Sequence, residues 1–235
     1  MIIWAGKSSD DFGIVVEHYP KIIIPRRKRE IQQIPGRNED FIIEQDAFEN
    51  YDQPYSVFIN AKDIGGLPAV VERIVDWLLA PSGYQRLEDS YMPDVYRMAY
   101  VNIQSNFGNT FNEYGRGTIT FNCAPQKFYK FGERKVELES GQKLYNPSAF
   151  KALPLITVKG TGSGSVVFNG KTIAISDIGN EVTIDAKMHR AYNGDTNRIS
   201  TITGNFEDLV LGKETEISWS GGVTGISVIP RWWTI

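Results

Sequence analysis

Short stretches of β-branched and aromatic residues, separated by turn residues, recur along almost the whole chain, and one stretch departs from this pattern. Between Thr118 and Cys123, for example, polar and apolar residues alternate, which is typical of a strand with one buried face. The exception lies between Pro68 and Pro81, where apolar residues recur at helical spacing. Because proline fits the first turn of a helix and ends a helix that it follows, these residues predict the helix ends. The sequence therefore predicts a mainly β fold with one α-helix.

Strands are predicted from the same pattern in both parts of the chain. They are 12–17, 21–25, 40–43, 55–61, 95–103 and 117–124 in the first part, and 155–160, 181–186, 215–221 and 225–232 in the second. Asn169 and Gly170 stand between two apolar runs, and because both positions of such a turn need positive φ, they predict a β-hairpin. The segment 160–165 (GTGSGS) is predicted to be a β-turn and not a phosphate-binding loop, since a strand follows it where a helix would be needed.

A polar stretch at 135–152, which contains Gly141 and Pro147, follows no period and predicts a boundary between two domains, 1–135 and 136–235. A chain of 235 residues is long enough to form two hydrophobic cores. The first domain contains the helix. The second contains only predicted strands with turns at regular intervals, which favours an antiparallel β-sandwich.

Composition excludes several classes of function. With one cysteine, Cys123, and two histidines, His18 and His189, the chain can form neither an internal disulfide nor a cysteine–histidine zinc site. Cys123 shares its strand parity with Ile119 and Phe121, so we expect a buried, inert thiol. The formal charge of −3 argues against binding of nucleic acid by bulk charge, and no apolar run reaches the ~18 residues of a membrane helix. We therefore expect no catalytic residue, cofactor or metal site, no membrane insertion and no specific nucleic-acid recognition.

The sharpest charge feature is a basic run in the first domain, which consists of Arg26, Arg27, Lys28 and Arg29. Six basic residues and one acid, Glu30, lie between residues 21 and 37. The run lacks the interleaved aromatic residues on which binders of single-stranded nucleic acid stack the bases. We interpret it as a solvated loop or as an ion-pairing surface against another subunit.

Tryptophans could mark a sugar-binding surface, because their flat rings stack on sugars. Adjacent residues of a strand point to opposite faces, so we expect at most one of Trp232 and Trp233 in the core. The other is a candidate exposed aromatic residue. Core packing or a contact between subunits is the favoured interpretation, and a sugar platform is the alternative.

A series of motifs follows a fixed order along the chain. In the first domain it consists of FGIVVE (12–17), PRRKRE (25–30), IPGRNEDF (34–41), VVERIVDWLL (70–79), YQRLED (84–89) and GRGTITFNCAPQKF (115–128). In the second it consists of LPLITVKGTGSGSVVFNGKTIAI (153–175), EVTIDAKMHRAYNG (181–194) and GISVIPRWW (225–233). This ordered series resembles the distal tail protein (Dit) family of siphovirus-type bacteriophages over essentially the whole chain.

The resemblance implies a β-barrel-type N-terminal domain with one α-helix and a galectin-like antiparallel β-sandwich at the C-terminus. It implies a structural protein and not an enzyme: a homo-oligomer, hexamer or double hexamer, that forms a ring at the distal end of the tail tube. The ring would be built by 1–135 around an axial passage for DNA, and 136–235 would project outward. Its location would be the tail tip or baseplate of the virion, after assembly in the cytoplasm of the bacterial host.

The resemblance also implies partners. They are the major tail tube protein, the tail-tip (tail-associated lysin) protein and receptor-binding or baseplate proteins. On this basis the basic run, together with a turn beside it, is a candidate subunit interface or lumen-facing loop, with an ordinary hairpin connection as the alternative for the turn. The turn consists of Pro35, Gly36 and Arg37.

A second class of function stays open. The alternative is a carbohydrate-binding module that recognises a saccharide of the host cell wall without forming a ring. Some relatives carry a long arm or a sugar-binding domain inserted into this framework, whereas the second domain here spans about a hundred residues with short loops. A built-in glycan-binding domain is therefore not expected.

Overall fold

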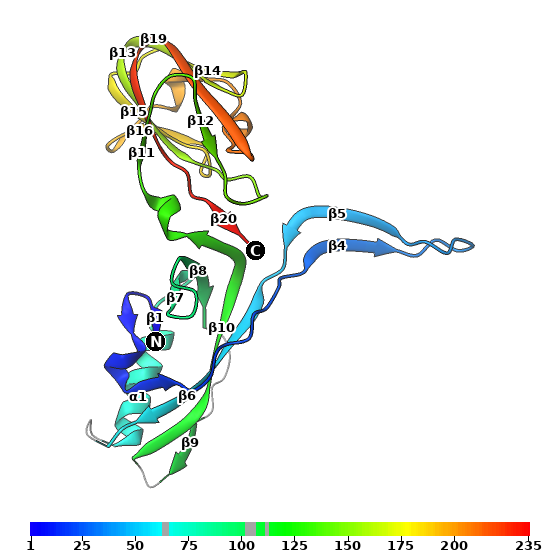
Figure 1. Cartoon of the computed structure of the whole chain (residues 1–235), viewed down its shortest axis with the longest axis vertical. Helices are drawn as coiled ribbons and strands as arrows, with labels where there is room; N and C mark the ends of the chain where they lie inside the picture. Colours follow the sequence, from blue (N-terminus) through cyan, green and yellow to red (C-terminus); the bar gives the residue numbers. More distant parts are fainter. Residues whose placement is uncertain (63–65, 102–106, 111–112) are drawn as a thin grey trace. The chain divides into compact units, whose positions relative to one another are not determined.

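The computed structural model describes residues 1–62, 66–101, 107–110 and 113–235. They form two compact units, unit 1 with residues 1–127 and Ile235, and unit 2 with residues 128–234 (Figure 1). Residues 128–135, assigned to the first domain from the sequence, belong to unit 2. The predicted fold class, mainly β with one α-helix, is confirmed.

The described residues of unit 1 form one large sheet, one α-helix and a separate two-stranded sheet, β4–β5. The large sheet has the strand order β2-β1-β7-β8-β10-β6-β3, and β9 also pairs with β10. The elements are β1 (Ile2–Trp4), β2 (Lys7–Ser8), η1 (Ser9–Phe12), β3 (Ile14–Val16), β4 (Arg27–Gln32), β5 (Phe41–Phe48), β6 (Tyr51–Asn60), α1 (Leu67–Leu79), β7 (Gln85–Asp89), β8 (Val95–Tyr100), β9 (Phe107–Thr110) and β10 (Tyr114–Tyr129).

The helix predicted between Pro68 and Pro81 is confirmed as α1, with Pro68 in its first turn. Its apolar stripe is buried in the core of unit 1. Trp77 stacks on Phe12 with ring centroids 4.8 Å apart, and its Nε1 donates a hydrogen bond of 3.1 Å to the carbonyl oxygen of Trp4. These contacts fix α1 against the N-terminal strands. Among the described residues, no helix has the length and apolar character needed to span a membrane.

Unit 2 is a β-sandwich whose two layers share the long strands β13 and β19. In one layer the order is β11-β19-β13-β15-β16-β17; in the other, β12 pairs with β19, and β14 pairs with β13 and β18. The elements are η2 (Lys130–Glu133), β11 (Val136–Leu138), β12 (Gln142–Tyr145), β13 (Leu155–Phe168), β14 (Lys171–Ile175), β15 (Asn180–Asp185), β16 (Arg190–Asn193), β17 (Thr196–Asn197), η3 (Ile199–Thr201), β18 (Ile202–Thr203), η4 (Phe206–Asp208), β19 (Glu214–Ile229) and β20 (Trp233–Thr234).

Glycines allow the strands β13 and β19 to continue from one layer into the other. β13 and β19 change register between Lys159 and Gly164, where their backbones come very close. A Cβ atom added to Gly222 would lie 1.7 Å from the carbonyl oxygen of Thr161, so no side chain fits there. The β-turn predicted for 160–165 is therefore wrong: the glycines allow close approach inside one bent strand, β13, and do not reverse the chain.

The other predicted strands are mostly confirmed. The hairpin at Asn169 and Gly170, whose φ angles are 45° and 81°, joins β13 to β14 as predicted. Segments 215–221 and 225–232 are not two strands, because β19 is continuous through Gly221–Gly225. The strand predicted at 95–103 is β8 (Val95–Tyr100), and residues 102–103 lie outside the described residues. The strand predicted at 21–25 is wrong, because no described strand pairs with this segment.

Candidate interaction surface

The basic run lies at the start of a β-hairpin that forms its own two-stranded sheet. We call this hairpin, residues 27–48, the arm; it comprises β4, a connection and β5. Every residue of β4 is exposed, and so are the first six residues of β5. The arm is therefore a ribbon that no other described element covers on either face.

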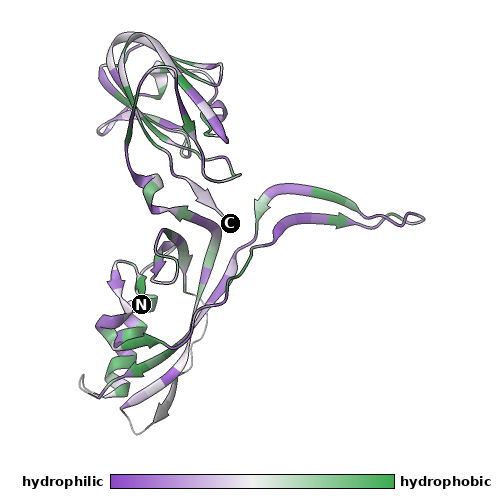
Figure 2. Ribbon diagram, in the orientation of Figure 1, coloured by the Kyte–Doolittle hydropathy of each residue, from purple (hydrophilic) through white to green (hydrophobic). Residues whose placement is uncertain are grey.

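Apolar side chains are exposed on both faces of the arm. Ile31 lies directly opposite Ile42 on one face, whereas Phe41 and Ile43 alternate with Ile42 and so point to the other. Their exposed fractions lie between 38% and 57%. Figure 2 shows that both strands of the arm are hydrophobic next to the connection and hydrophilic farther along. A two-stranded ribbon is at best marginally stable alone in water, and a large exposed apolar patch marks a binding surface.

Arg27, Lys28 and Arg29 of the basic run lie on β4, which pairs with β5, and not in the predicted loop, whereas Arg26 directly precedes this strand. Arg29 lies opposite Glu44, and its Nε is 2.9 Å from a carboxylate oxygen of that residue. Arg27 lies over the ring of Phe48, with 5.0 Å between its Cζ and the ring centroid. Arg26 and Lys28 are exposed and form no ion pair with any described residue. Two of the four cations are thus available to a partner.

The turn Pro35, Gly36 and Arg37 lies in the connection between β4 and β5. The N–H of Arg37 donates to the carbonyl oxygen of Ile34 over 3.0 Å, and Gly36 has a φ of 84°. Proline followed by a residue with positive φ is the signature of a type II turn, which favours glycine at that position. The local structure is thus a hairpin connection. Its role as an interface or lumen-facing loop stays a prediction.

The structure does not place Trp232 on the surface. Its side chain is only 5% exposed and belongs to the core of unit 2. The prediction of Trp232 as a candidate exposed aromatic residue is therefore wrong. Trp233 is half-buried: its ring stacks on Phe150 at 4.6 Å, and Nε1 donates to the carbonyl oxygen of Lys151 over 2.9 Å. The physical reason is that both faces of this final segment are covered. Neither ring forms a free platform for a sugar.

The inert character predicted for Cys123 agrees with the structure. The side chain is buried, and burial raises the pKa of its thiol to about 12, so the reactive thiolate is not populated at neutral pH. Among the described residues, no three His, Cys, Asp or Glu side chains lie close enough to one another to bind a metal ion.

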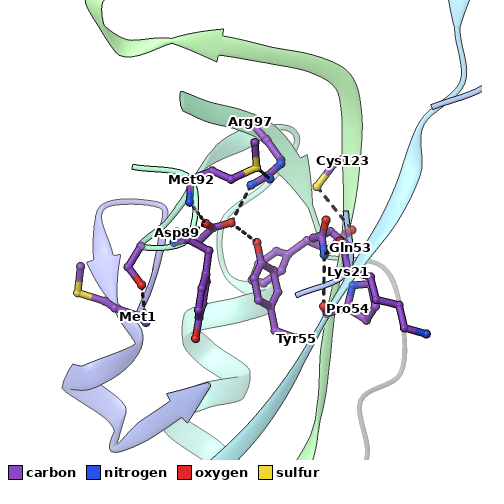
Figure 3. A network of polar contacts seen from close by, with 12 residues as sticks. Met1, Lys21, Gln53, Pro54, Tyr55, Asp89, Met92, Arg97 and Cys123 are labelled. Carbon is purple, nitrogen blue, oxygen red and sulfur yellow. Dashed lines mark hydrogen bonds and ion pairs between the residues drawn. The ribbon is translucent and has the colours of Figure 1, made fainter. Parts of the chain in front are cut away.

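A buried polar network, not predicted from the sequence, lies beside the base of the arm (Figure 3). Asp89 Oδ2 accepts hydrogen bonds from Tyr55 (2.7 Å) and from Nη1 of Arg97 (2.8 Å). Burial alone would raise the pKa of Asp89, but the Tyr55 hydrogen bond and the charge of Arg97 outweigh it and hold the pKa below its usual value. Arg97 also donates from Nε to the hydroxyl of Tyr51 over 3.0 Å.

A sequence signal for this network existed. In β8 the residues alternate between buried and half-buried positions, and Arg97 shares its parity with Val95 and Ala99. A charged residue on the buried face of a strand must have a partner, because an unpaired buried charge is strongly unfavourable. The partner, Asp89, lies on the neighbouring strand β7, so only the strand pairing identifies it.

Comparison with solved structures identifies the fold. It is the fold of a phage distal tail protein, as the sequence resemblance predicted. The solved structure to which this chain is similar is the crystal structure of the SPP1 Dit (gp 19.1) protein. That protein is described as a paradigm of the hub adsorption apparatus in phages that infect Gram-positive bacteria. The TM-score is 0.78, with 12% sequence identity, over 100% of this chain and 98% of that chain.

Other comparisons add no further assignment. Two structures of the phage p2 baseplate in its activated conformation, with Ca and with Sr, each align with 92% of this chain and 90% of theirs at 10% identity. Their TM-scores of 0.48 and 0.45 are too low to define a common fold. The sequence matches no protein-family model. It also matches no curated protein.

Proposed function

We propose that this chain is a structural protein of a phage tail, which assembles with copies of itself into a hub ring at the distal end of the tail tube. The observation that carries the proposal is the arm: an uncovered ribbon with apolar side chains on both faces, in a chain with the Dit fold. A ring requires a head-to-tail interface that closes on itself, and an arm that reaches a neighbouring copy provides one.

Charge supports a second copy as the occupant of the arm. Residues 21–37 carry six basic residues and one acid, a formal charge of +5, whereas the whole chain carries −3. The remaining residues therefore carry −8. A basic arm that contacts the acidic remainder of another copy gains electrostatic complementarity, which favours correct pairing and fast association. In this proposal Arg26, Arg27, Lys28 and Arg29 lie at the subunit interface, and Pro35, Gly36 and Arg37 contact a neighbour or the axial passage.

The remaining roles follow from the same proposal. Unit 1 forms the ring, as proposed for residues 1–135, and unit 2 projects outward, as proposed for 136–235. The partners are the major tail tube protein, the tail-tip protein and receptor-binding or baseplate proteins, and the location is the tail tip of the virion. The protein acts by assembly and not by catalysis; the buried, protonated Cys123 supports this.

The first test is the oligomeric state. We expect light scattering coupled to size exclusion to give six times the 26.5 kDa of the chain, or twelve times for a double ring, and negative-stain images to show six-fold rings. A species that stays monomeric at high micromolar concentration would contradict the proposal. If that monomer also bound a glycan array, and lost binding on Tyr192→Ala in the depression lined by His189 and Asp195, the carbohydrate-binding module would replace it.

The second test concerns the basic run. Arg26→Glu with Lys28→Glu is expected to weaken ring formation, because the two cations without a partner in the described chain would meet the acidic neighbour with reversed charge. The effect should be largest at low salt, where screening is weakest, and the thermal unfolding of the protomer should change little. The matched control is Lys159→Glu with Lys171→Glu, exposed cations of unit 2. Unchanged rings at low salt would reject this placement.

A further inference from the structure

A small cavity lies between an extended segment and the sheet of unit 1. The segment, residues 19–23, covers the polar network, and the Nε2 of Gln53 donates to the carbonyl oxygen of Lys21 over 3.2 Å (Figure 3). The cavity has a volume of about 160 Å³, and its lining includes Tyr51, Arg97 and Lys127. Tyr19 and Ile22, which also line it, are exposed, so its rim is accessible.

Lys127 is a mostly buried lysine beside this cavity, and no described residue supplies a counter-ion for it. Its side chain is only 7% exposed, and it forms no hydrogen bond or ion pair with any described residue. Burial lowers the pKa of its ammonium group, and the positive charge of Arg97 lowers it further. Buried lysines are rare unless an anion compensates them, because removing an ammonium group from water is costly.

The carboxylate of Asp89, which lies in this region, already accepts hydrogen bonds from other groups. Oδ2 of Asp89 accepts from Tyr55 and Arg97, and Oδ1 accepts from the backbone N–H groups of Tyr91 and Met92 at 3.0 and 2.8 Å. Asp89 therefore balances the charge of Arg97, and no described residue compensates that of Lys127. Nη1 and Nη2 of Arg97 each keep one further N–H for which no described residue supplies an acceptor.

We infer that this cavity binds a carboxylate group, which accepts hydrogen bonds from the ammonium of Lys127 and from the remaining N–H groups of Arg97. One negative charge balances the one excess positive charge, whereas a phosphate brings about −1.5 to −2 at neutral pH. The planar guanidinium also matches the geometry of a carboxylate. The group belongs either to a small free carboxylate or to an Asp or Glu side chain of a second copy; only the second source depends on the proposed function.

The test compares thermal unfolding of the full chain in sodium acetate and in sodium chloride at equal ionic strength. At a protein concentration where the chain is monomeric, saturating acetate is expected to raise the midpoint by about 2–4 °C. Lys127→Met should remove this response without lowering the midpoint in chloride, because it removes an uncompensated charge. Lys127→Arg should keep the response, and so should Lys7→Met, which removes an exposed lysine of the same unit.

The concentration of the protein distinguishes the two sources. If assembled protein responds to acetate as the monomer does, the natural ligand is a free carboxylate. If the response is confined to the monomer, a side chain of a second copy fills the cavity in the assembly. Equal midpoints of the wild-type monomer in acetate and chloride, or an unchanged response in Lys127→Met, would overturn the inference. A chain that never assembles but responds to acetate refutes the ring and supports the cavity.

Discussion

Aspartate at both Ile31 and Ile42 is expected to abolish ring formation while the protomer stays folded. The two side chains lie directly opposite each other on one face of the arm and are 57% and 49% exposed in the single chain. Substitutions at exposed positions change stability by only about 0.5 kcal/mol. In a ring the same positions would be buried, so each aspartate would remove apolar contact of about 1.5–3 kcal/mol and place a charge there. Assembly should therefore weaken by at least about a hundredfold.

The matched control places the same two charges on exposed apolar residues outside the arm. Tyr145→Asp with Met188→Asp changes residues of unit 2 that are at least as exposed as Ile31 and Ile42. Light scattering should give the mass of the monomer for the arm variant and that of the ring for the control, and near-ultraviolet circular dichroism should be native for both. If the arm variant still forms rings, the arm is not the assembly surface. Loss of rings in the control alone would place that surface on unit 2.

Local sequence patterns predicted most of the fold because their physical causes are local. The stripe of α1, the alternation in β10 and the positive φ angles at Asn169 and Gly170 depend only on neighbouring residues. The segments 160–165 and 21–25 were predicted wrongly for the opposite reason. The glycines of 160–165 allow the backbone of β19 to come close to β13. The apolar residues of 21–25 pair with no strand in the described chain.

The candidate site was predicted only in part. The run of four basic residues was found directly in the sequence. The apolar faces of the arm were not predicted, because 40–43 indicates only a short strand and does not show whether that strand is covered. Whether such a strand is covered depends on the tertiary structure. The cavity is lined by Arg97 and Lys127, which are thirty positions apart, and by a segment near the N-terminus. No periodic pattern in the sequence predicts that these residues lie close together.

Arg97→Met is expected to destabilise unit 1 by about 3–5 kcal/mol, because it leaves the carboxylate of Asp89 buried without its cation. The side chains of this pair are 5% and 0% exposed, and their atoms lie 2.8 Å apart. Native-state hydrogen exchange at the amides of β6 reports the free energy of unfolding for unit 1 alone. The control is Arg29→Met, which removes the exposed pair with Glu44 and should cost less than about 1 kcal/mol.

The pH dependence separates loss of the charge pair from loss of packing. In the wild type the pKa of Asp89 lies below its unfolded value, so its contribution is complete above about pH 4 and is lost as the pH falls through the folded pKa. Without Arg97, burial favours the protonated carboxyl, and Asp89 takes up a proton at higher pH than in the unfolded chain. The difference in unfolding free energy between wild type and Arg97→Met should therefore shrink as the pH falls from 7 to 4. A difference that does not change with pH would assign the loss to packing of the arginine side chain and would refute a stabilising charge pair.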